Sequence, residues 1–138
     1  EHSIWVSRYS SAVDRLEGLL HDASEAYLSD LSRPVKHCTP IGAPYLEIEK
    51  RLMHAIVNKF GLSDAMPNSV KEADNFLLWA EKQLLMQPVS WRNPGDWDAK
   101  KPDEMMRLPK LDGYLPANAE ILFLDVFEQL TRSLKAVN

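Results

Sequence analysis

The sequence has little cysteine and lacks any long hydrophobic run. Cys38 is the single cysteine among 138 residues, so no disulfide can form within the chain, and a reducing compartment is expected. No apolar stretch approaches the roughly 20 residues that span a bilayer, and we expect no signal peptide, since no stretch resembles one. These absences predict a cytoplasmic protein that does not enter a membrane.

An excess of positive charge is also missing. Lysine and arginine number 16 against 20 acidic residues, which gives a net charge of −4. Proteins that bind nucleic acids or anionic membranes normally carry a basic surface, so neither partner is expected. A small anionic substrate remains compatible with this balance, because a bound divalent cation can supply positive charge locally.

What the sequence does contain is helical spacing of apolar residues, without strand-like alternation or internal repeats. The 45% hydrophobic content is enough for one domain over residues 1–138. We predict an all-α fold with about five main helices. They cover residues 1–9, 12 to about 25–27, 45–60 with a left-handed stop at Gly61, 70–86, and 116 onward. Residues 28–44 form a connection and residues 87–115 a long irregular arm. The chain begins within a helical pattern, so an upstream segment is expected.

The stretch LHDASEAYLSDL, residues 20–31, combines apolar residues with a histidine and three acidic residues. Glu25 lies three positions after Asp22 and four after His21, so on one helix it would share a side with each of them. Imidazole and carboxylate together suit a divalent Mn, Co, Zn, Fe or Ni ion. A His-Asp pair alone is weak evidence, because it also describes a surface ion pair.

Two further residues strengthen the hypothesis of a metal site. Asp74 lies among apolar residues of another predicted helix, where a carboxylate is costly to bury unless it is paired or binds a metal. His2 lies beside apolar residues at the start of the chain. The simpler alternatives are an Asp74–Lys71 pair and a frayed terminal histidine.

The run HDASEAYLSDLSRPVK, His21 to Lys36, resembles the HD-domain phosphohydrolase superfamily, and more narrowly its 5'-deoxynucleotidase-like branch. That branch has a His-Asp pair followed by Glu, then Gly-Asp, then Pro-x-Lys. VKEAD, residues 70–74, resembles its last-ligand helix, and EHS, residues 1–3, its first-ligand helix. Ser29 departs from the branch by replacing the glycine before Asp30, which restricts the backbone there.

The resemblance implies a role for each matching residue. One divalent metal ion would be held by His2, His21, Asp22 and Asp74. Glu25 and Asp30 would act on the attacking water or the nucleotide, although Asp30 alone could simply cap a turn. Lys36 lies where the family has a basic residue after the proline and would meet phosphate. Apart from the resemblance, Arg33 is a second candidate to share the charge on the phosphoryl oxygens, and Trp5, three residues from His2, is a candidate to contact the nucleotide.

The expected function is therefore metal-dependent hydrolysis of (deoxy)nucleotides, in which a metal-activated water attacks a phosphate of a deoxynucleoside mono- or triphosphate. Magnesium could accompany the substrate. A non-catalytic metal-binding interaction module and a hydrolase of a signalling nucleotide are the alternatives. The resemblance also implies a homo-oligomer, a dimer or larger, with residues 87–116 as a candidate contact.

Overall fold

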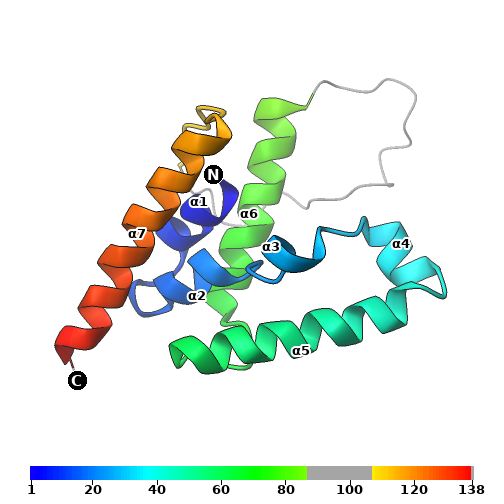
Figure 1. The fold of residues 1–138 in the computed structure, drawn as a ribbon. Coiled ribbons are helices and arrows are strands. Elements are labelled where there is room, and N and C mark those ends of the chain that lie inside the picture. Colours follow the sequence, from blue (N-terminus) through cyan, green and yellow to red (C-terminus); the bar gives the residue numbers. More distant parts are fainter. Residues whose placement is uncertain (87–106, 138) are drawn as a thin grey trace.

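The computed structural model describes residues 1–86 and 107–137, with side chains as far as Arg132 (Figure 1). The elements are α1 (His2–Tyr9), a 3-10 turn (Ala12–Asp14), α2 (Arg15–Leu20), α3 (Glu25–Leu28), α4 (Arg33–Cys38), α5 (Gly42–Phe60), α6 (Asn68–Leu85) and α7 (Pro116–Val137). The described residues contain no strand, so the predicted all-α class is confirmed. None of these helices is both long and apolar enough to cross a membrane.

The core is formed where α1, α2 and α6 pack against one another, with α7 lying along α1 and α2 (Figure 1). Its central cluster is fully buried and consists of Val6, Val70, Ala73, Phe76 and Leu77. The helical spacing of apolar residues in 70–86 predicts a stripe of Val70, Ala73, Leu77, Ala80 and Leu84, and its first three members belong to this cluster. The stripe was wrong only at its end, because Leu84 is 47% exposed.

Close packing of α1 on α2 depends on Gly18. A β-carbon at this position would lie 2.6 Å from the Ser10 hydroxyl oxygen and 3.0 Å from the Ser7 α-carbon. Any side chain would therefore push the two helices apart. This contact fixes the end of α2, from which His21 extends, against the start of the chain.

The α4–α5 pair forms an arm beside this core, with α4 at the end of α5 farther from α7 (Figure 1). Apart from Gly42, α5 has no buried residue. The helix ends at Gly61, whose φ of 65° and ψ of 34° are left-handed, and the Leu62 N–H donates to the Val57 carbonyl at 2.9 Å. The predicted stop at Gly61 is thus confirmed. Near this end, Phe60 contacts Phe127 of α7 edge to face.

Two predicted boundaries were wrong. The second helix stops at Leu20 and does not continue to residues 25–27. The backbone N–H groups of Ala23 and Glu25 instead bond to carbonyls three residues earlier, which forms turns before the short α3. The connection at 28–44 also contains a helix, α4, with Pro34 in its first turn, where a missing N–H costs nothing.

The predicted arm at 87–115 lies mostly outside the described residues, as does most of the oligomer contact placed at 87–116. Residues 107–115 are described and have no regular secondary structure. The Glu1 carboxylate accepts hydrogen bonds from the backbone N–H groups of Asp112 and Tyr114. This stretch is therefore tied to the beginning of α1.

Candidate metal centre

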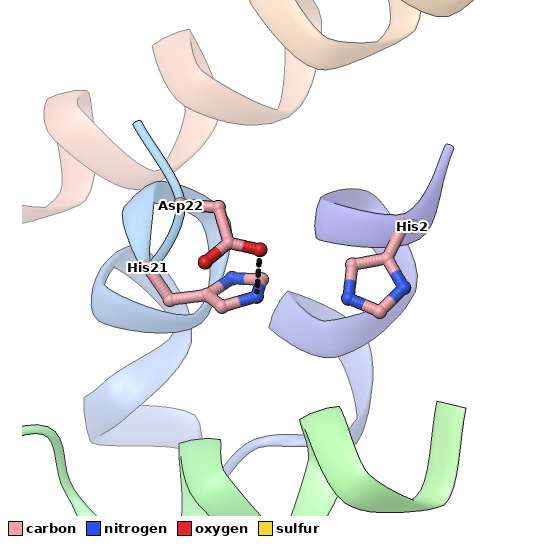
Figure 2. A group of neighbouring side chains, drawn as sticks. All are labelled: His2, His21 and Asp22. Carbon is pink, nitrogen blue, oxygen red and sulfur yellow. Dashed lines mark ion pairs between the residues drawn. The ribbon is translucent and has the colours of Figure 1, made fainter. Parts of the chain in front are cut away.

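Three separate segments meet where the core reaches the surface. His2 comes from the first turn of α1, His21 and Asp22 follow the end of α2, and Asp74 lies on α6. One ligand atom from each of His2, His21 and Asp22 lies within 4.8 Å of the other two (Figure 2). This convergence could not be predicted from spacing in the sequence, because it results from the packing of α1 on α2.

Asp74 joins the same group from α6. Its Oδ1 atom lies 3.2 Å from Nε2 of His2 and 3.8 Å from Nε2 of His21. The predicted alternative, an ion pair with Lys71, is not what this carboxylate forms. Asp74 thus lies against both histidines, while the three residues whose ligand atoms are all within 4.8 Å of one another are His2, His21 and Asp22.

His21 is arranged as a metal ligand would be. Its side chain is only 1% exposed, and its Nδ1–H donates to the Gly18 carbonyl at 2.9 Å. That bond assigns the proton to Nδ1 and leaves the Nε2 lone pair toward the other three residues. Nε2 is buried and makes no hydrogen bond to the described residues, although Asp22 Oδ2 lies 2.9 Å away. In the metal-free protein Asp22 is thus the charge partner of this nitrogen, and a bound cation would take the place of its proton.

His2 is held from both sides of its ring. Nδ1 lies 2.9 Å from Glu81 Oε1, and Nε2 lies 3.2 Å from Asp74 Oδ1. Burial acts to lower the pKa of His2, but the hydrogen bonds and charges of Asp74 and Glu81 outweigh it and raise the pKa to about 9. Without a metal, the ring is therefore an imidazolium at neutral pH, and His2 is not a frayed terminal residue.

The pKa values of His21 and Asp22 are shifted in opposite directions. Burial acts to lower the pKa of His21, and the adjacent Asp22 carboxylate outweighs it, so this pKa is also raised. Burial acts to raise the pKa of Asp22, and the positive charge of His21 reverses the effect and lowers it. In the metal-free protein the two imidazole rings are therefore paired with the carboxylates around them, and a divalent cation would take the place of their protons.

The donor set fits a divalent transition metal. Two imidazole nitrogens and two carboxylate oxygens suit Zn, Mn, Co, Fe or Ni. His21 forms the buried side of the group at 1% exposed, whereas the side chains of His2, Asp74 and Asp22 are 29%, 37% and 45% exposed. A site open on its carboxylate side can accept water or a substrate, as catalytic metal sites do.

Glu25 begins α3, directly after the turn that follows Asp22. Its burial, together with the negative charges of Asp22 and Asp30, raises the pKa of its carboxyl group above the usual value. A carboxylate with a raised pKa is a better proton acceptor near neutral pH. The electrostatics of Glu25 are therefore those of a proton acceptor.

Asp30 and Lys36 form a second charged cluster beside Glu25. The Lys36 ammonium lies 3.3 Å from Asp30 and 3.0 Å from Glu49, and it lies 5.4 Å from the centre of the Tyr45 ring. Lys36 is thus restrained by two carboxylates, that of Asp30 between α3 and α4 and that of Glu49 on α5. A phosphate reaching it would compete with these pairs.

Ser29 connects this cluster to α3 through a strained backbone. Its φ is 59° with ψ at 145°, a conformation that glycine adopts readily and serine does not. The Tyr45 hydroxyl donates to the Ser29 carbonyl, which holds the strained residue against α5. The departure from glycine noted in the sequence therefore falls where glycine would be favoured.

The other two predicted substrate-binding residues, Trp5 and Arg33, have different surroundings. Trp5 packs against the core cluster, with Tyr9 stacked on it and the Arg8 guanidinium 4.8 Å from its ring centre. Its ring contacts are therefore those of a packing residue. Arg33 is exposed at the first turn of α4, from which a long side chain remains free to reach solvent.

Two residues were not predicted from the sequence: Glu81, which contacts His2, and Glu49, which contacts Lys36. Glu81 lies seven residues after Asp74, and that spacing places both on one side of α6. Once Asp74 is chosen as a candidate metal ligand, this spacing on the helix indicates Glu81 as its neighbour. Glu49 had no comparable signal, since its role depends on how the arm folds back on Lys36.

A cavity of about 450 Å³ opens between α2, α5 and the start of α6. Its lining is mainly apolar, with Leu20, Met53 and Val57 among the residues, and His21 forms part of its wall. Asp22, Glu25 and Asp74 are not among its lining residues. The cavity therefore borders the candidate metal group through His21 alone.

Comparisons with known proteins found two similar sequences and no assigned function. The chain is 33% identical over 85 residues to Uncharacterized protein YfdR of Escherichia coli (strain K12), covering 62% of this chain and 46% of that protein. It is 38% identical over 80 residues to Uncharacterized protein RCAP_rcc00048 of Rhodobacter capsulatus, covering 53% and 40%. The chain thus spans less than half the length of each relative. No family model and no solved structure matches it.

Proposed function

We propose that the protein is a metal-dependent phosphohydrolase that acts on deoxynucleotides. The observation that carries the proposal is the convergence of residues from three segments: ligand atoms of His2, His21 and Asp22 lie within 4.8 Å of one another, and Asp74 lies 3.2 and 3.8 Å from the two histidines. Nε2 of His21, which faces this group, is buried. These four residues would hold one divalent ion. Such an ion, when bound, makes a water molecule acidic enough to attack at neutral pH and offsets negative charge on phosphoryl oxygens.

Glu25 would accept a proton from the attacking water. It lies three residues from Asp22, and its raised pKa favours proton uptake near neutral pH. Because its carboxylate is only half-buried, it can also orient the water by a hydrogen bond. A metal group that served structure alone would not need such a residue beside it.

Lys36 would bind a phosphate oxygen of the substrate. Its ammonium is held by Asp30 and Glu49 in the free protein, so an incoming phosphate would exchange with one of these carboxylates. Arg33, exposed at the start of α4, would add a second positive charge. Asp30, released from Lys36, could then accept a hydrogen bond from a sugar hydroxyl or the water.

The nucleotide part of the proposal is supported by the resemblance of residues 21–36 to the 5'-deoxynucleotidase-like branch. The acidic net charge of −4 fits a small anionic substrate carried with a cation better than a nucleic acid. Assembly into a homo-oligomer belongs to the same proposal. Deoxynucleoside monophosphates come first as substrates and triphosphates second.

A substrate screen tests this function directly. The purified protein is incubated with common nucleotides in Mn, Co, Mg or Zn, and both phosphate and triphosphate are measured. We expect metal-dependent release of one of these products, and a loss of about 100-fold or more in Glu25→Gln. Glu47→Gln, an exposed site on α5, is the matched control and should keep full activity.

The non-catalytic alternative makes the opposite prediction. A metal-binding interaction module would take up one ion per chain and release no product from any nucleotide. Full turnover in Glu25→Gln would also contradict the proposed mechanism, because the proton acceptor would then lie elsewhere. Release of product only from a signalling nucleotide would change the substrate and leave the metal chemistry in place.

A further inference from the structure

The two histidines of the metal centre are oriented by different kinds of partner. His21 donates from Nδ1 to the Gly18 carbonyl, and His2 donates from Nδ1 to the Glu81 carboxylate, each at 2.9 Å. In both rings Nε2 is thereby left for the group between them, with ring centres 5.5 Å apart. One orienting partner belongs to the backbone, so only the other can be altered by a side-chain substitution.

Glu81 is fixed by the same helix that carries Asp74. The two residues are seven apart on α6, which is about 20° short of two full turns. Asp74 meets Nε2 of His2 at 3.2 Å while Glu81 meets Nδ1. The helix thus holds the imidazole at both nitrogens, and the core cluster on its buried side keeps the helix in place.

We propose that Glu81 is a positioning residue of the metal centre, which holds the His2 ring so that Nε2 faces the ion. The inference rests on the metal site of the proposed function. A carboxylate that accepts from the outer nitrogen of a ligand histidine fixes the ring orientation and makes the inner nitrogen a stronger donor. Glu81 lies on the far side of the ring from Nε2, so it acts through His2.

A purely structural ion pair between Glu81 and His2 is the competing explanation. It would lower the stability of the metal-free protein and leave the affinity for metal unchanged. The two explanations therefore separate in a binding measurement that does not depend on catalysis. Glu81→Ala removes the carboxylate, and Glu81→Gln keeps an oxygen that can accept from Nδ1–H without its charge.

The experiment titrates the full chain with Zn²⁺ against a chromogenic chelator and records the visible absorption of the Co²⁺-loaded protein. We expect Glu81→Ala to weaken binding of both ions by about 10- to 100-fold and to change the Co²⁺ spectrum. Glu81→Gln should recover part of the affinity. Glu72→Gln, on an exposed turn of the same helix, is the control and should bind like the unaltered protein.

Each result decides between the possibilities. Unchanged affinity in Glu81→Ala, with an unchanged Co²⁺ spectrum, would overturn the positioning role and leave the proposed hydrolase intact. Absence of Zn²⁺ and Co²⁺ binding to the unaltered protein would overturn both. Weakened binding in Glu81→Ala together with no turnover of any nucleotide by the unaltered protein would support the positioning role and reject the hydrolase.

Discussion

The two halves of the candidate site are built very differently. The candidate metal ligands lie on or beside helices of the packed core, where Val6, Val70 and Leu77 are fully buried. The charged cluster of Asp30, Lys36 and Glu49 comes from the α3–α5 region, where α3 and α4 have no buried residue. The metal half is thus held by close packing, and the substrate half by ion pairs and a few half-buried side chains.

This difference in packing indicates different roles for the two halves of the candidate site. A metal site needs its ligands fixed to a fraction of an ångström, which a rigid core provides. A region with few buried apolar contacts opens more easily, as segments that admit and release ligands do. We expect the core half to hold its geometry with or without substrate and the arm to adjust when a nucleotide binds.

The largest effect should come from removing core packing. Leu77→Ala should lower the free energy of unfolding by about 2–5 kcal/mol, because it leaves a cavity beside Phe76 and Ala73. Leu52→Ala on α5 removes a half-buried side chain and should cost about 1 kcal/mol. Urea denaturation measures both. Equal losses at the two positions would contradict the contrast.

Helical spacing anticipated this contrast in part. The stripe of α6 and the stop at Gly61 were both predicted, because periodicity and a left-handed glycine are local signals. The turn after Leu20 was not, since His21 and Asp22 are held by contacts with α1 and α6 that no local pattern encodes. The helix α4 was missed because its proline and polar residues also describe a loop.

The candidate site shows the same limit. His21, Asp22 and Glu25 could be chosen from one short run, whereas the distance of Asp74 from His2 depends on helices 72 residues apart in sequence. Spacing on a helix could have found Glu81. Nothing in the sequence indicated that Lys36 would be paired with Glu49, because that contact requires the arm to fold back.

Metal binding should stabilise the two halves unequally. At a concentration 100 times its dissociation constant, an ion that binds only the folded state adds about 2.7 kcal/mol to the free energy of unfolding. Asp74→Asn should abolish most of this gain, and Asn75→Asp, an exposed neighbour, should retain it. Thermal unfolding with and without Zn²⁺ gives the comparison.

Amide hydrogen exchange shows which helices the bound ion stabilises. Added Zn²⁺ should slow amide exchange in α1, the end of α2 and the middle of α6 and leave α5 nearly unchanged. Slowing confined to α4 and α5 would place the ion in the other half of the site and contradict the account.

Relief of backbone strain should give a smaller gain. Ser29→Gly places a residue suited to φ of 59° at the junction of the two halves and should add about 1 kcal/mol to the free energy of unfolding. Ser32→Gly is the control, because Ser32 has a φ of −53° and no capping hydrogen bond from its side chain. It should lose about 0.5 kcal/mol. A destabilised Ser29→Gly would show that the positive φ is not strained.

The smallest effects concern the proton acceptor. Burial and the Asp22 and Asp30 charges raise the pKa of Glu25, Lys36 lowers it, and Glu49 raises it further. If Glu25 accepts the proton, kcat/KM falls as the pH drops through this pKa.

Two substitutions should therefore shift the acid limb of the pH profile of kcat/KM in opposite directions. Lys36→Met should move the limb to higher pH, and Glu49→Gln should move it to lower pH. Arg51→Met, exposed on the same helix as Glu49, should leave it in place. Shifts in the same direction would separate the acid limb from Glu25.

The most direct measurement is anomalous diffraction from crystals grown with Co²⁺ or Zn²⁺, recorded at the absorption edge of the metal. The account predicts one strong peak per chain at about 2.0–2.2 Å from nitrogens of His2 and His21 and from oxygens of Asp22 and Asp74. A peak elsewhere, or none at a concentration that saturates binding in solution, would contradict it.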